Sequence, residues 1–137
     1  MRWDEALAER YEGPKMVAHF WVPAAGVVAT RVEGHVDVGA VRFYSSRVDR
    51  MLFAGEPVRS FHDWSKITGF APEVRPAYRG WVERRMKLLS PPHILVKSKI
   101  LGMAIAATDL VLRHGIVAHS ELSPFAVALE SAIRDRS

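Results

Sequence analysis

The chain has 137 residues, of which 49% are hydrophobic and 25% charged, and its formal net charge is +4. This length fits one domain with a sizeable core, and the composition is ordinary for a globular protein. Because the chain has no cysteine, disulfides, thiolate catalysis and cysteine-based zinc sites are excluded. The basic residues are interleaved with acidic ones at helical spacing, so we expect solvated helix faces and no nucleic-acid-binding surface.

The ends and apolar runs of the chain give an expectation for its location. The N-terminus begins with charged residues and has no apolar signal core, so export is not expected. The longest apolar run, residues 100–112, is interrupted by Thr108 and Asp109, and a membrane span needs roughly 20 apolar residues. We therefore expect a cytoplasmic protein, which the absence of cysteine fits.

The first third of the chain predicts a helix and a hairpin. An apolar stripe at helical spacing predicts a leading helix over residues 2–12. Two strand-like runs, residues 16–22 and 27–32, flank a turn that contains proline and glycine, and this pattern predicts a β-hairpin. We accordingly divide the chain into an N-terminal helix or extension, residues 1–15, and one domain, residues 16–137.

The rest of the chain alternates helices with strands. The predicted strands cover residues 58–61, 93–98 and 116–119, and the predicted helices cover 38–53, 99–113 and 124–134, with another from near Pro72 or Pro76 to residue 89. Strands separated by single helices form right-handed crossovers. The sequence therefore predicts an α/β domain with one mostly parallel sheet and a hairpin at its edge.

Residues 58–70 join a short strand to the second long helix. The sequence predicts a polar loop from Asp63 to Phe70 at this junction. The helix N-terminus beyond it offers free N–H groups and a partial positive charge. We expect this loop to face a partner or ligand. The side chains expected to act there are Asp63, Trp64, Ser65, Thr68, Phe70 and Glu73.

No pattern in the sequence predicts catalysis, a metal or a cofactor. His62 and Asp63 are a close pair of histidine and acid at a strand end, but neighbouring strand residues point to opposite faces. Asp63 is expected to cap backbone N–H groups instead. The six histidines lack the spacing of helical metal ligands. Phosphate-cradling glycine loops and nucleophile motifs are absent as well.

Four segments carry a family resemblance. Gly34-His35-Val36-Asp37 is similar to the Gly-x-Leu-Asp that ends the second strand of the STAS domain family, the fold of bacterial anti-sigma-factor antagonists. Residues 61–68 and 93–99 resemble its third and fourth strands, and residues 125–129 its closing helix. The resemblance implies a single-domain STAS-like fold over residues 16–136. It also implies a non-enzymatic signalling module that docks a protein partner or itself as a homodimer.

The chain departs from this family where the regulatory switch should be. Antagonists of the family are phosphorylated on a serine or threonine at the start of the second helix, but Ala71-Pro72-Glu73 stands there. We therefore expect no phosphorylation switch at the family's position. Glu73 places a fixed charge near the positive end of the helix, either as a mimic of the modified state or simply as a stabilising residue. Ser65 and Thr68 are either other phosphoacceptors or turn formers.

Residues 99–113 predict a helix that is apolar around nearly its whole circumference. Such a helix is either buried on every side or covered by a partner. The residues expected at an interface are Trp81, Gly102, Met103 and Ala106. An alternative function is small-ligand binding, because the architecture also resembles lipid-carrier folds related to STAS domains. The aromatic and methionine side chains would then line a pocket for a lipid or nucleotide.

Overall fold

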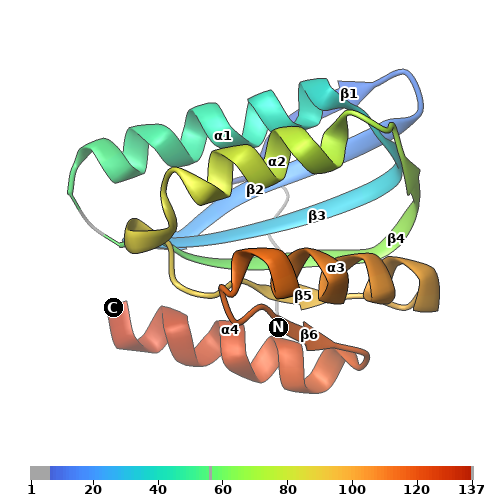
Figure 1. Cartoon of the computed structure of the whole chain (residues 1–137). Coiled ribbons are helices and arrows are strands. Elements are labelled where there is room, and N and C mark those ends of the chain that lie inside the picture. The colour runs from blue at the N-terminus through green and yellow to red at the C-terminus, as the bar shows by residue number, and fades with distance from the viewer. Residues whose placement is uncertain (1–6, 56, 137) are drawn as a thin grey trace.

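The computed structural model describes residues 7–55 and 57–136 (Figure 1). The strands are β1 (Glu9–Gly13), β2 (Met16–Ala24), β3 (Val27–Val36), β4 (Arg59–Phe70), β5 (His93–Leu95) and β6 (Val117–His119). The helices are α1 (Val38–Phe53), α2 (Val74–Glu83), α3 (Lys99–Leu112) and α4 (Leu122–Arg136), with a 3₁₀ turn at Met86–Leu88. None of these helices is long and apolar enough to cross a membrane.

The strands form one six-stranded sheet whose spatial order, β1 to β6, follows the chain. The first three strands are antiparallel neighbours, and Gly26 supplies the positive φ of 71° in the turn between β2 and β3. From β3 to β6 every pair is parallel, because α1, α2 and α3 each return the chain to the same end of the sheet. The predicted α/β class and mostly parallel sheet are confirmed.

The predicted leading helix is wrong for residues 9–12, which belong to β1 and pair with β2 in a register that runs from Glu9↔Phe20 to Gly13↔Met16. Tyr11, part of the predicted helical stripe, instead donates a hydrogen bond from its hydroxyl to Asp37 at 2.7 Å. Pairing with the next strand along the chain therefore overrides the helical spacing of the apolar residues. This part of the predicted extension belongs to the sheet, while residues 2–6 of the predicted helix lie outside the described residues.

The end of β3 and the start of α1 are fixed by the Gly-His-Val-Asp segment. Gly34 has a φ of 94°, and a Cβ atom there would lie 2.2 Å from the carbonyl oxygen of Lys15. Only glycine fits such a conformation and such a close approach. Asp37 caps α1 by accepting a hydrogen bond from the backbone N–H of Ala40 at 3.0 Å. The local chemistry of this motif therefore sets where α1 begins.

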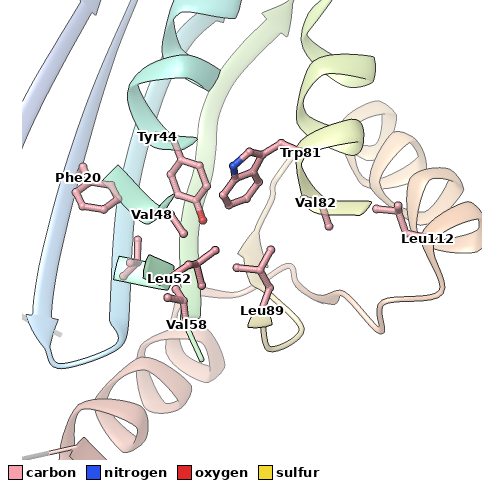
Figure 2. Packing of buried hydrophobic residues seen from close by; sticks show 10 residues of the cluster. Phe20, Tyr44, Val48, Leu52, Val58, Trp81, Val82, Leu89 and Leu112 are labelled. Carbon is pink, nitrogen blue, oxygen red and sulfur yellow. The ribbon is translucent and has the colours of Figure 1, made fainter. Parts of the chain in front are cut away.

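The helices cover the two faces of the sheet unequally (Figure 1). Alternation along β3 sends Val28 toward α1 and α2, whereas Ala29 points toward α4 on the opposite face. On the first face, Tyr44, Val48 and Trp81 belong to a cluster of buried side chains between the sheet and the helices (Figure 2). α3 packs on the same face, farther along the sheet, over Ile94 and Val96 of the β5 region.

The polar loop predicted from Asp63 to Phe70 is instead the second half of β4. These residues pair in parallel with β3, from Arg31↔Asp63 to Val36↔Phe70, with two shifts of register. The long β3 offers them a pairing edge, and Ile67 and Phe70 pack against the buried cluster around Ile94. Burial of these two apolar side chains favours a strand here, although the polar residues between them are typical of a loop.

Candidate functional site

The six residues predicted to face a partner divide between the interior and the surface. Asp63 accepts hydrogen bonds from the backbone N–H and the hydroxyl of Ser65, at 3.1 and 2.6 Å. It also forms an ion pair with Arg31 at 3.6 Å, so it stabilises the irregular part of β4, much as its expected capping role implied. Trp64 and Phe70 turn inward toward the helices, whereas Thr68 and Glu73 are exposed.

A pocket of about 150 Å³ lies between the sheet and helices α1, α2 and α3. Its wall is almost entirely aliphatic and aromatic. Residues that define it include Phe20, Val32, Val36, Phe43, Trp64, Ile67, Phe70, Ala104 and Ile105. The inward residues of the second half of β4 therefore help to form this pocket, in place of the surface loop expected there.

The polar centre of the pocket wall is formed by Thr30, His62 and Tyr44. His62 is 2% exposed, and its Nδ1 lies 2.7 Å from the hydroxyl of Thr30 on β3. Its Nε2 lies 3.5 Å from the hydroxyl of Tyr44 on α1. Burial lowers the pKa of His62 to about 3, so this imidazole is neutral at pH 7. A neutral ring has one N–H donor and one acceptor nitrogen.

The two tyrosines that line the pocket are also uncharged. Burial raises the pKa of Tyr44, to which the neighbouring Tyr78 adds, and burial raises the pKa of Tyr78 as well. Their rings lie 6.2 Å apart. Among the described lining residues, Arg75 brings a permanent charge; it is exposed, and its guanidinium donates to the hydroxyl of Thr108 at 3.3 Å. Charge is therefore confined to the rim between α2 and α3.

Sequence reasoning did not identify this polar centre. Residues Thr30 and His62 sit opposite each other in the register of β3 and β4, on the face that carries Val28 and Phe20. A polar residue at an inward position of each of two neighbouring strands was the available signal. This signal can be recognised only when the pairing of the two strands is known, and the pattern of each strand alone does not give that pairing.

The outer face of α3 is the second feature with functional potential. Leu101, Ile105 and Leu112 are buried beneath the helix, but Ile100, Met103 and Leu110 are 82%, 72% and 79% exposed. We call the exposed apolar residues of this helix the α3 face. They are Ile100, Met103, Ala106, Ala107, Leu110 and Val111.

Two of the four residues expected at an interface belong to the α3 face, namely Met103 and Ala106. Gly102 is only half-buried beside it. Trp81 does not lie at the surface, as an interface residue would. Its side chain is 5% exposed, and its indole N–H donates a hydrogen bond to Asp49 at 3.0 Å. An amphipathic helix hides its aromatic residues in the core, which the sequence pattern alone did not distinguish from an interface.

Charges at the ends of α3 are basic. Lys99 is the first residue of the helix, and Arg113 follows its last residue. The carboxylate of Asp109 accepts hydrogen bonds from the backbone N–H groups of His114, Gly115 and Ile116, at 3.2, 2.9 and 3.1 Å. Asp109 is the one acidic residue of α3, so Lys99 and Arg113 leave the two ends of the α3 face basic.

Histidines also meet on the opposite side of the sheet. Nδ1 of His93 lies 2.9 Å from Nε2 of His119, and the two rings are stacked at 5.2 Å. Burial lowers the pKa of both residues. Among residues 7–55 and 57–136, no three histidine or acidic side chains come together as a metal site would require.

No family model and no curated protein matches this sequence. Solved structures share its fold. The anti-sigma factor antagonist SpoIIAA in its unphosphorylated form is 15% identical, with a TM-score of 0.59 over 83% of this chain and 97% of its own. An uncharacterized DUF3478 protein from Shewanella loihica PV-4, described as SpoIIAA-like in fold, is 7% identical, with a TM-score of 0.61 over 89% and 91%.

A third similar structure is an anti-sigma factor antagonist from Mycobacterium paratuberculosis. It is 12% identical, with a TM-score of 0.57 over 88% of this chain and 99% of that protein. At such low identities the likeness is one of fold. The chain is a STAS-like domain in architecture, as its sequence motifs predicted.

Proposed function

We propose that this STAS-like domain is a non-enzymatic regulatory module that docks another protein through the α3 face. The observation that carries the proposal is the row of exposed aliphatic side chains on α3, including Ile100, Met103 and Leu110. Leaving such side chains in water is unfavourable, and contiguous apolar patches of this kind mark interaction sites.

The spacing of the α3 face suits a partner helix. Ile100, Met103, Ala107 and Leu110 recur at intervals of three and four residues, which is the seam of a helix pair. Ala106 and Ala107 at the centre are small, so a second helix can approach closely between the larger side chains at each end. Binding of an amphipathic helix is a recurrent mode of recognition by proteins.

The charges around the α3 face favour a different protein over a second copy of this chain. An antiparallel two-fold pairing of α3 places Lys99 opposite Arg113 of the other copy, and a parallel pairing places each opposite itself. Both arrangements bring like charges together, which disfavours association. We therefore expect the partner helix to carry acidic residues around its apolar stripe.

The named structural neighbours support a protein partner, since two are anti-sigma factor antagonists. In our proposal, docking is not switched by phosphorylation at the start of α2. That segment reads Ala71-Pro72-Glu73, and Glu73 makes no side-chain capping bond. Thr68 and Glu73 are secondary candidates for partner contact because both are exposed.

Matched charge substitutions test the proposal. Met103→Glu places a charge in the α3 face, and Val127→Glu places one at a similarly exposed site, 59% open, on α4. Each variant and the natural chain would be used to capture proteins from source cells, with thermal unfolding as a control for folding. We expect a partner that is lost only with Met103→Glu, and whose purified complex weakens as salt rises.

Two results would count against the proposal. One is an identical set of captured proteins for all three chains. The other is a homodimer, seen by light scattering of the purified chain, that Met103→Glu dissociates. The second result would assign the α3 face to self-association.

A further inference from the structure

The pocket beneath α1, α2 and α3 is separate from the α3 face and has the features of a ligand site. Its wall is apolar, with aromatic side chains such as Phe20, Trp64 and Phe70. Its buried polar groups are few and centre on His62, while Arg75 and Thr108 stand at the rim. Pockets that bind small molecules combine an apolar wall with a few convergent polar groups in this way.

The hydrogen bonds of His62 are unevenly satisfied. The contact between Nδ1 and the Thr30 hydroxyl is short, at 2.7 Å. The contact between Nε2 and the Tyr44 hydroxyl is 3.5 Å, well beyond the distance of a good bond to a hydroxyl. Thus Nε2 is a buried polar atom with only a weak partner, and a ligand atom placed beside it would gain a hydrogen bond.

In the neutral imidazole, Nε2 can either donate a hydrogen bond to a ligand or accept one from it. When the Thr30 hydroxyl donates to Nδ1, the proton of His62 resides on Nε2, which then donates to a carbonyl oxygen. When Nδ1 donates to Thr30, Nε2 accepts from a hydroxyl. The Thr30 hydroxyl allows both tautomers because it is itself a donor and an acceptor.

Size and charge restrict the ligand further. A volume of about 150 Å³ is comparable to that of engineered cavities that take up benzene. The lowered pKa of His62 and the raised pKa values of Tyr44 and Tyr78 leave these pocket groups uncharged. An ionised group of a ligand would lose its hydration there without a counter-charge.

From this geometry we infer that the pocket binds a small uncharged compound with an apolar ring-sized body and one hydroxyl or carbonyl group directed at His62. The inference gives physical support to the small-ligand alternative, and it replaces the lipid or nucleotide expected there. A nucleotide is charged. A fatty acid could instead bind with its carboxylate against Arg75 at the rim of the pocket, and the benzoate titration below tests this case.

The test titrates the full chain with phenol, toluene and benzoate and follows binding by calorimetry and by the NMR signals of the tryptophan side chains. Toluene has the shape of phenol without the hydroxyl, and benzoate adds a charge. We expect phenol and toluene to bind with shifts of the Trp64 signal, because Trp64 stacks on His62 at 5.4 Å. We expect no measurable binding of benzoate.

Two alanine variants on one helix locate the binding. Ala104 lines the pocket, whereas Ala107 is on the α3 face, so Ala104→Leu should weaken phenol binding at least tenfold and Ala107→Leu should leave it unchanged. His62→Phe removes the polar group and should lower the preference for phenol relative to toluene at least fivefold. Thr30→Val removes the hydrogen-bond partner of Nδ1 that holds the imidazole of His62 in place, and it provides a second variant if His62→Phe does not fold.

Several outcomes would overturn the inference. These are the absence of binding by both neutral probes, equal binding to the Ala104→Leu variant, or an unchanged phenol preference in both polar variants. Benzoate that binds as tightly as phenol, and loses that binding in Arg75→Gln, would instead assign the pocket to anionic amphiphiles. Because the readout is binding of a small probe, docking of a protein on the α3 face does not influence it.

Discussion

α3 and α4 are nearly equal in length and cover opposite faces of the sheet (Figure 1), yet they are anchored very differently. α4 buries Phe125 and Leu129 at 1% and 0% exposure and ends in charged residues. α3 lies over a pocket on its inner side and leaves the aliphatic α3 face on its outer side.

The difference indicates that α4 mainly stabilises the fold, whereas α3 carries the features expected of a binding site. α4 comes closer to the rule for a surface helix, because its apolar stripe is buried and its last turn is charged, although Leu122 and Val127 are exposed. α3 breaks that rule on both sides, because its outward residues are apolar and part of its inward contact is replaced by a pocket. Departures of this kind are expected where a site has been selected for binding instead of stability.

The largest expected effect contrasts leucines on the two helices. Leu129→Ala on α4 removes a fully buried side chain, so it should lower the free energy of unfolding by about 3 kcal/mol. Leu110→Ala on the α3 face should change it by less than about 0.5 kcal/mol. Urea denaturation of both variants measures the two values. Equal losses would show that α3 is as firmly anchored as α4.

A smaller expected effect is the pH dependence of the free energy of unfolding, which we assign mainly to the sheet face beneath α1, α2 and α3. The folded-state pKa of His62, about 3, is below the unfolded value of 6.5, so the unfolded chain binds a proton that the folded chain does not. Stability is therefore fully present above pH 6.5 and is lost as pH falls. Between pH 7 and pH 5 this one group should lower the free energy of unfolding by about 2 kcal/mol.

The control for this pH effect is His62→Gln. Burial also lowers the pKa of His93, His119 and His114, and these three groups act in the same direction. If the pocket histidine dominates, the slope of stability against pH should flatten strongly in His62→Gln. A slope that is unchanged in this variant would place the sensitivity at the other three histidines.

The smallest of these effects concerns the end of α3. Asp109→Ala deprives the backbone N–H groups of His114, Gly115 and Ile116 of their acceptor, so it should cost about 1 to 2 kcal/mol. Asp109→Asn keeps an acceptor oxygen and should cost less. Thermal unfolding of the pair measures the difference. Equal losses would mean that these hydrogen bonds need the negative charge of the carboxylate acceptor, which an amide oxygen does not supply.

Much of the fold could be predicted because its signals are local. The apolar stripe that contains Tyr44, Val48 and Leu52 placed α1 over the residues that form it. Parallel connection of the later strands followed from the alternation of elements. What failed was the pairing of strands, which the pattern of a single segment does not show: β1 exists because it pairs with its neighbour β2, and the second half of β4 exists because β3 offers an edge.

The candidate site was predicted only in part, for related reasons. Met103 and Ala106 were found because an all-apolar helix is visible in the sequence itself. The polar centre of the pocket was not found because Thr30, Tyr44 and His62 come from three elements and meet only after folding. Trp81 was misplaced because an aromatic residue on a helix reads alike in a core and at an interface.

Hydrogen–deuterium exchange of the chain, alone and in complex with the partner lost in the Met103→Glu capture, tests the central claim most directly. Docking through the α3 face predicts added protection concentrated in residues 99–112 and unchanged exchange in residues 122–136. Protection of α4 with unchanged exchange across α3 would contradict it.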